Sequence, residues 1–164
     1  MKCNFIVFGL WLSIAGFAQT VEQPVDTPQR ANDFTYTLAS EEQGTLYEIQ
    51  SERTLLYFYN PTCEDCQLLM EQLSESDVIN RLIANKRLTV LAVYPEEADD
   101  IWEEHAELVP KTWINGYDQE AKINIEGIYI ITKFPALYLL DKDKNIILNE
   151  TTLEEVVKQL RIEN

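Results

Sequence analysis

The chain has 164 residues, a formal net charge of −15, and 46% hydrophobic against 25% charged residues, which suits a single globular domain. The acidic balance argues against nucleic-acid binding, which favours clustered lysine and arginine, and against docking on anionic lipid. The chain is not a disordered acidic tail, because its apolar residues come in periodic runs.

Residues 1–18 have the pattern of a secretory signal peptide. A short basic start precedes the apolar run FIVFGLWLSIAGFA, and Gly16 and Ala18 suit cleavage before Gln19. The run is shorter than the ~20 residues of a membrane-spanning helix, so no stable insertion is expected after cleavage, and an uncleaved membrane anchor is the alternative. Cleavage would remove Cys3 and leave Cys63 and Cys66, and an exported, periplasmic protein with this pair lies where disulfides form and persist.

The mature chain is predicted to begin with a flexible, polar N-terminus at residues 19–33, followed by one domain over residues 34–164. Residues 34–38 alternate in polarity and are predicted to form a strand, and residues 44–49 a short helical turn. Residues 54–60 form a continuous apolar run rich in strand-forming residues, which is typical of a strand buried on both faces of a sheet.

An apolar stripe begins at Cys66 and recurs at Leu69, Met70 and Leu73, which predicts an amphipathic helix that breaks at residues 74–77 and then resumes. The next elements are predicted to be a second buried strand at 88–94, an acidic helix at 95–108 and a loop at 110–118. They are followed by a hairpin of strands 136–141 and 145–149. A last helix at 151–160 is opened by a capping box of Thr152 and Glu155. Strands that alternate with helices are expected to be parallel. The fold class is therefore α/β, with a mixed sheet flanked by helices.

The strongest chemical signal is the cysteine pair in NPTCEDC, which directly follows the first buried strand and opens a helix. At a helix start, Cys63 would meet unpaired backbone N–H groups and the positive end of the helix dipole, which favour its thiolate and prepare a nucleophile. Glu64 and Asp65 place negative charge beside it and are expected to modulate this effect. Cys66, one turn on, is spaced to close a disulfide with Cys63.

Two other uses of the cysteine pair compete with redox chemistry. A zinc site needs further Cys or His ligands, and the single histidine, His105, lies in a predicted acidic helix, so no metal is expected. A purely structural disulfide is the other alternative, although so short a loop would constrain the unfolded chain little. No Gly-rich phosphate loop is present, and no cofactor beyond the cysteines is expected.

Three segments, LLYFYNPTCEDC, LTVLAVY and FPALYLLDKDKNIIL, resemble the thioredoxin-like superfamily in its exported thiol–disulfide oxidoreductase branch. The resemblance covers roughly residues 34–160 and implies a thioredoxin-like fold with an N-terminal β and turn extension. It also implies that Pro135 is the cis-proline that faces the cysteines in this family. Thr62, Phe134 and Pro135 would then form the substrate groove.

The sequence departs from thioredoxin itself at three places. Thr62 stands where thioredoxin has Trp, Glu-Asp stands between the cysteines in place of Gly-Pro, and Tyr57 falls where thioredoxin has a buried acid. These departures put efficient general disulfide reduction in doubt. They favour an alternative from another class, a thioredoxin-fold binding module whose Cys-x-x-Cys disulfide is largely inert.

The function expected from motif and resemblance is thiol–disulfide exchange with exported proteins, with reduction as the expected direction. Cys63 would attack a substrate disulfide and Cys66 would resolve the mixed disulfide. The expected partners are protein thiols and disulfides in the cell envelope, together with a membrane electron donor if the protein is a reductase.

Overall fold

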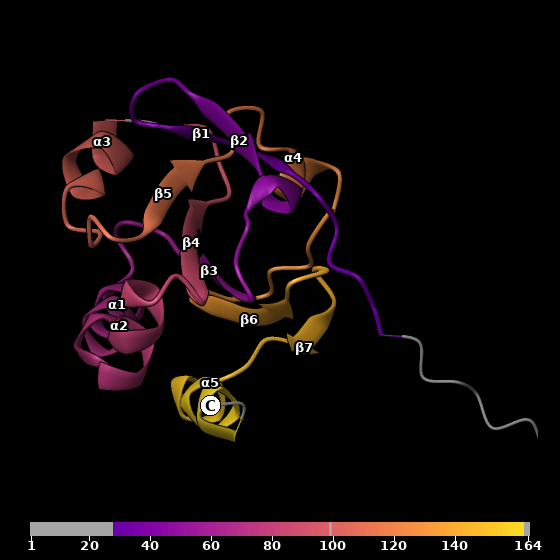
Figure 1. Cartoon of the computed structure of the whole chain (residues 1–164). Coiled ribbons are helices and arrows are strands. Elements are labelled where there is room, and N and C mark those ends of the chain that lie inside the picture. Colours follow the sequence, from indigo (N-terminus) through magenta and orange to yellow (C-terminus); the bar gives the residue numbers. More distant parts are fainter. Residues whose placement is uncertain (1–27, 99, 163–164) are drawn as a thin grey trace, which may run out of the picture.

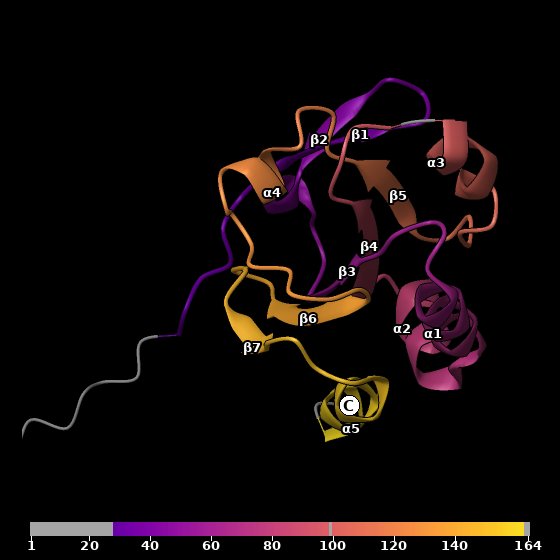
Figure 2. The ribbon, with the colours of Figure 1, turned by 180° about the vertical axis from the view of Figure 1, so that it is seen from behind.

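The computed structural model describes residues 28–98 and 100–162 as one mixed sheet with helices around it (Figures 1 and 2). The predicted signal peptide, residues 1–18, lies outside the described residues. Within the described ranges, no helix is long and apolar enough to cross a membrane.

The elements follow the predicted alternation of strands and helices. In chain order they are β1 (Thr35–Leu38), β2 (Gln43–Thr45), the 3-10 helix η1 (Leu46–Glu48), β3 (Arg53–Phe58), α1 (Glu64–Glu75), α2 (Asp77–Ala84), β4 (Leu88–Tyr94), α3 (Asp100–Ala106), β5 (Ile114–Tyr117), α4 (Lys122–Ile125), β6 (Ala136–Asp141), β7 (Ile146–Leu148) and α5 (Leu153–Ile162). The sheet has seven strands in the order β2-β1-β5-β4-β3-β6-β7. Strands β3, β4 and β5 are parallel and the outer strands antiparallel, which confirms the α/β class and the mixed sheet.

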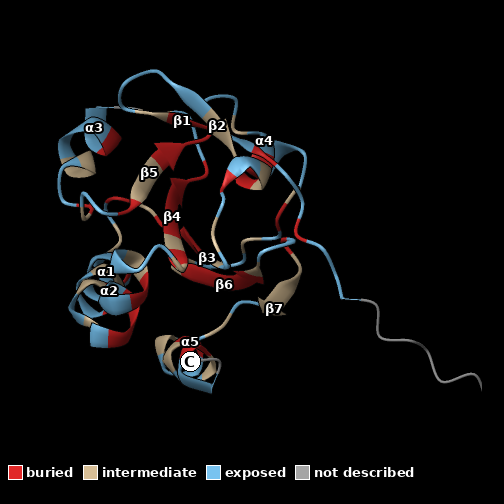
Figure 3. Ribbon diagram, in the orientation of Figure 1, coloured by how far each residue is buried: buried red, intermediate tan, exposed pale blue. Residues whose placement is uncertain are grey.

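The sheet separates two hydrophobic layers. Strand β3 supplies both, because successive side chains point to opposite faces: Leu55 and Tyr57 pack beneath α1, α2, α3 and α5, whereas Leu56 and Phe58 pack beneath η1 and α4. All four side chains are fully buried (Figure 3). Burying an apolar side chain of this size contributes about 1.5–3 kcal/mol, so burial on both faces stabilises β3, the strand that leads to the cysteines.

The structure corrects the prediction of a loop over residues 110–118, because this segment contains β5. Asn115 and Gly116 are typical of a turn, but they lie in a strand that pairs with β4 on one side and with β1 on the other. Gly116 is required there for close approach, since a Cβ would lie 3.0 Å from the backbone oxygen of Thr37 and 3.0 Å from the ring of Tyr36.

Two further boundaries differ from the sequence prediction. Helix α3 begins at Asp100, so Pro95 does not open it; Pro95 instead lies in the turn after β4, where its carbonyl accepts a hydrogen bond of 2.8 Å from Asn124. The predicted helical turn at residues 44–49 is shorter, because Gly44 pairs with β1 as part of β2. The break between α1 and α2 is confirmed.

The described part of the predicted flexible N-terminus, residues 28–33, runs alongside the β6–β7 hairpin. The backbone oxygen of Gln29 accepts a hydrogen bond of 2.8 Å from Ile146, and the backbone N–H of Ala31 donates one of 2.8 Å to Lys144. Ala31 is 2% exposed. Backbone bonds and burial therefore hold this stretch against the hairpin.

Candidate active site

The pairing of β3 with β6 brings the cysteine motif and the predicted cis-proline to one end of the sheet. Phe58, the last residue of β3, lies opposite Ala136, the first residue of the antiparallel β6. The chain leaves β3 toward Cys63 and enters β6 directly from Pro135. The Phe134–Pro135 peptide bond is cis, as the family resemblance implied.

A turn organised by Asn60 carries the chain from β3 to the cysteines. The side-chain oxygen of Asn60 accepts hydrogen bonds from the backbone N–H of Thr62 at 2.9 Å and from its hydroxyl at 2.8 Å. The backbone oxygen of Asn60 accepts a third bond, of 3.1 Å, from Cys63. Sequence reasoning missed this residue, although an Asn-Pro pair is a known turn signal.

Cys63 is the N-cap of α1, as its place before the helix predicted. Its Sγ accepts a hydrogen bond of 3.2 Å from the backbone N–H of Cys66, and its side chain is partly exposed. A partly exposed sulfur at a helix N-terminus, with a backbone donor directed at it, is the setting in which proteins present a nucleophilic thiol. Glu64 and Asp65 occupy the first turn and are exposed.

Cys66 has the opposite environment. It is 1% exposed, and burial raises the pKa of its thiol to about 12. A backbone hydrogen bond from Asn60 acts to lower that pKa, whereas the hydrogen bond with Cys63 and the charges of Cys63 and Asp65 act to raise it. Both cysteines are free thiols in the structure, so it shows the dithiol form, and the disulfide between them stays a prediction.

Tyr57 lies beneath the cysteine turn, at the position where thioredoxin has an acid. It is fully buried, and its hydroxyl donates a hydrogen bond of 2.7 Å to the backbone oxygen of Cys66. Burial raises the pKa of this phenol well above its ordinary value, so it stays protonated. The sequence predicts no such role for Tyr57, because a side-chain contact to a backbone atom leaves no pattern in the sequence.

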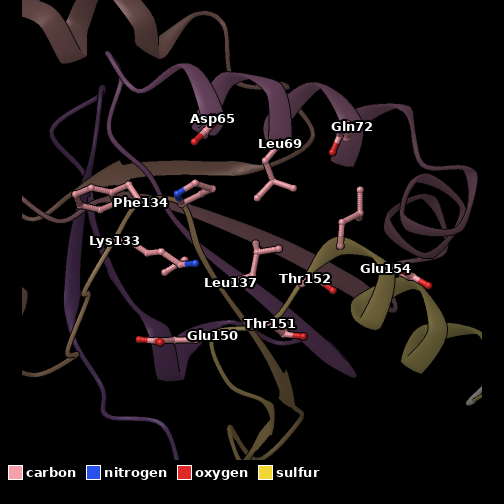
Figure 4. Close-up of a pocket in the computed structure, with 13 residues that line it drawn as sticks. Asp65, Leu69, Gln72, Lys133, Phe134, Leu137, Glu150, Thr151, Thr152 and Glu154 are labelled. Atoms are coloured by element: carbon pink, nitrogen blue, oxygen red, sulfur yellow. The ribbon is translucent and has the colours of Figure 1, made fainter.

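A groove of about 480 Å³ opens beside the cysteine turn (Figure 4). Asp65 and Leu69 of α1 form one wall, and Phe134 lies across from them; Pro135 also lines the groove. The groove continues to the start of α5, where Glu150, Thr151, Thr152 and Glu154 line it. Two of the three predicted groove residues, Phe134 and Pro135, therefore line this space, whereas Thr62 bonds to Asn60 in the preceding turn.

The structure also bears on the metal alternative. Among residues 28–98 and 100–162, no three His, Cys, Asp or Glu side chains are grouped so that they could hold a metal ion. His105 is partly buried on α3, with its Nδ1 2.8 Å from the backbone oxygen of Ile101.

The chain is similar to solved structures from Bacteroides. It is 39% identical to a thioredoxin-like protein from Bacteroides caccae, with a TM-score of 0.82 over 85% of this chain and 50% of that one, so it spans half of that protein's length. It is 43% identical to the C-terminal domain of an uncharacterized protein from Bacteroides fragilis, with a TM-score of 0.80 over 82% of this chain and 96% of that one.

A more distant structure shares the fold alone. The thioredoxin domain of a thiol-disulfide oxidoreductase from Bacteroides vulgatus is 18% identical, with a TM-score of 0.71 over 84% of this chain and 96% of that one. No protein-family model matches the chain, and no curated protein matches it.

Proposed function

We propose that this chain, which has a thioredoxin-like fold, is a thiol–disulfide oxidoreductase whose reacting couple is Cys63 and Cys66. The observation that carries the proposal is the contrast between the two sulfurs. Cys63 is partly exposed at a helix N-terminus and its Sγ accepts a hydrogen bond from a backbone N–H, whereas Cys66 is buried one turn further along the helix. A nucleophile and a protected second thiol are the two parts that disulfide exchange needs.

The proposed reaction proceeds in two exchanges. The Cys63 thiolate attacks one sulfur of a substrate disulfide; the substrate S–S bond breaks, and one substrate thiolate leaves. Cys66 then gives up its proton and attacks the Cys63 sulfur, which releases the second substrate thiolate. The substrate gains two electrons and ends as two thiols, and the cysteine pair ends as a disulfide.

The groove supports a polypeptide as the substrate. Its apolar lining includes Leu69, Phe134 and Pro135, which can pack against an extended segment that carries a cysteine. Its charged lining residues are Asp65, Glu150 and Glu154 against the single cation Lys133. Segments with lysine or arginine beside the cysteine are therefore favoured.

The charge preference can be measured with matched peptide disulfides that carry Lys or Glu next to the cysteine. We expect exchange to be up to about fivefold faster with the Lys peptide, because exposed ion pairs contribute ~1 kcal/mol or less each. The preference should shrink in a Glu150→Gln, Glu154→Gln variant and persist in a Glu126→Gln control at the C-cap of α4. A preference that survives the double substitution would place the specificity elsewhere.

The direction and the place of the reaction are also part of the proposal. Glu64 and Asp65 place negative charge beside the cysteine pair, which opposes the stabilised reduced form that a strong oxidant needs and so supports reduction of substrates. The signal-peptide pattern over residues 1–18 supports export to the periplasm, where a membrane donor would return electrons to the pair. Protein from its native envelope should begin at Gln19 by mass spectrometry; a cytoplasmic species with intact Met1 would contradict export.

The decisive experiment is trapping with Cys66→Ser. This variant should accumulate a mixed disulfide through Cys63, because the resolving thiol is missing. In the reduced wild-type protein, Cys63 should be alkylated first and Cys66 slowly, as their exposure predicts. Equal alkylation rates would contradict the assigned roles, and peptide binding without any exchange would favour the binding module with an inert cysteine pair.

A further inference from the structure

We propose that Tyr57 is a positioning residue for the second exchange, because its hydroxyl fixes the helical turn that carries Cys66. This inference rests on the proposed oxidoreductase function and adds a residue to it. The contact that carries it is the hydrogen bond of 2.7 Å from the Tyr57 hydroxyl to the backbone oxygen of Cys66.

The ring of Tyr57 is held too firmly to follow a moving helix. It is fully buried on β3, stacks on Tyr59 with ring centroids 5.4 Å apart, and meets the edge of Trp113 at 6.3 Å. β3 is paired on both sides, with β4 and β6. The hydroxyl therefore links the first turn of α1 to a buried strand that is paired on both sides.

The second exchange depends on this position. The Cys66 thiolate must reach the Cys63 sulfur, and intramolecular attack is fast when the reacting atoms are held close in the productive geometry. The same preorganisation stabilises the closed disulfide relative to the dithiol, since less freedom is lost on closure. Loosening the Cys66 turn should therefore slow resolution and make the potential of the couple less negative.

Tyr59, one residue after the end of β3, provides a matched control. It has the same ring and is also buried, but its hydroxyl donates to Asn115 at 2.8 Å and accepts a bond of 3.1 Å from Trp102. Removal of either hydroxyl costs a buried hydrogen bond. Only the Tyr57 hydroxyl bonds to the turn that carries Cys66, whereas the Tyr59 hydroxyl bonds toward α3 and β5.

The test compares Tyr57→Phe with Tyr59→Phe. Each reduced protein is mixed with glutathione disulfide, the Cys63–glutathione mixed disulfide is followed by mass spectrometry after acid quenching, and the redox potential is measured against glutathione. Tyr57→Phe should resolve the mixed disulfide about tenfold more slowly, the effect of one lost hydrogen bond. Its potential should rise by up to ~30 mV, which corresponds to tenfold in the equilibrium. Tyr59→Phe should match the wild type in both.

A rescue variant covers the case in which Tyr57→Phe does not fold. Replacement of Tyr57 by 4-aminophenylalanine keeps an N–H donor at the same place and should restore resolution to within about threefold of the wild type. Unchanged resolution in Tyr57→Phe, equal slowing in both phenylalanine variants, or failure of the rescue would each overturn the role of Tyr57. A wild-type protein that forms no mixed disulfide would instead contradict the oxidoreductase function itself.

Discussion

The two ends of β6 differ in structure: its C-terminal end leads into a turn whose polar groups are hydrogen-bonded, whereas its N-terminal end borders an open groove. At its C-terminal end, Asp141 accepts hydrogen bonds from the backbone N–H groups of Asp143 and Asn145, both at 2.8 Å, and from the Asn145 side chain at 2.9 Å. Lys144 in the same turn is 2% exposed and donates to Ile49 at 2.8 Å. At the N-terminal end, Pro135 lines an open groove next to a partly exposed thiol.

The C-terminal end of β6 therefore contributes mainly to stability, and the N-terminal end to the proposed disulfide exchange. The turn at the C-terminal end closes a hairpin and ties it to the N-terminal segment, and Asp141, Lys144 and Asn145 all use polar side-chain groups in hydrogen bonds. The N-terminal end must leave the Cys63 sulfur accessible to a substrate, and its groove is empty space that contributes no packing. Substitutions at the two ends should therefore change different measured quantities.

The largest expected effect is at the groove end. Cys63→Ser should abolish disulfide exchange, because a hydroxyl cannot form the mixed disulfide, while the free energy of unfolding of the reduced protein stays within about 1 kcal/mol of the wild type. Exchange is measured with a peptide disulfide and stability by urea unfolding. Asp141→Ala, at the other end, should retain the exchange activity. Residual exchange in Cys63→Ser would remove Cys63 from the nucleophile's role.

The next largest expected effect is the pH dependence of the rate at which Cys66 resolves a mixed disulfide on Cys63. Because burial raises the pKa of this thiol to about 12, its thiolate is scarce at neutral pH. Resolution of a mixed disulfide on Cys63 should then accelerate about tenfold per pH unit between about pH 7 and 9, in step with the thiolate fraction. Quenched mass spectrometry at each pH measures the rate. A plateau below pH 9 would show that another group removes the proton.

At the turn end, the expected effect is on stability. Burial acts to raise the pKa of Asp141, but hydrogen bonds from Asn145 and Asp143 outweigh it, so the pKa is lowered from 3.8. A lowered pKa in the folded state means that the stabilisation is present above the unfolded value and is lost as the pH falls through the folded value. Asp141→Ala should cost about 2 kcal/mol in urea unfolding at neutral pH.

Measurement of the unfolding free energy as the pH is lowered tests whether the Asp141 carboxylate provides this stabilisation. The wild-type unfolding free energy should decline more steeply below about pH 4 than that of Asp141→Ala, which has lost the titrating group. Glu154→Gln, at an exposed position on α5, serves as a control for the general effect of removing a negative charge. Equal acid slopes in wild type and Asp141→Ala would assign the loss to packing rather than to the carboxylate.

The smallest effect concerns the acids between the cysteines. Replacing Glu64 and Asp65 by Gln and Asn removes two negative charges beside the cysteine pair, and the charge of Asp65 acts to raise the pKa of Cys66. The potential should become less negative by under ~30 mV, since exposed charges contribute ~1 kcal/mol or less. The shift should shrink at high salt. A double variant with a more negative potential would contradict this electrostatic account.

The sequence was sufficient for the parts of the site that depend on local patterns. A Cys-x-x-Cys after a buried strand and before an amphipathic stripe predicted the position of Cys63 at a helix N-terminus, and the resemblance implied the cis bond before Pro135. Cys66 was predicted to lie one turn further along the helix, and the structure shows it there as a buried residue.

The features that the sequence did not predict depend on neighbours distant in the chain. Strand β5 is short and contains Asn115 and Gly116, so its local propensity favours a turn; pairing with β4 and β1 overrides that preference. The Tyr57 contact reaches a backbone atom, and the wall of the groove at Glu150 comes from the segment after β7. Contacts of this kind leave no periodic pattern in the sequence.

The antiparallel register of β3 and β6 also has a consequence for folding kinetics. The cysteine turn and Pro135 are far apart in sequence, and they meet only when Phe58 pairs with Ala136. Such non-local pairs form late, because the entropy of closing the intervening chain must be lost first. The thiols therefore exist before their groove does, and a chain arrested before β6 docks beside β3 carries the dithiol without a place for a substrate.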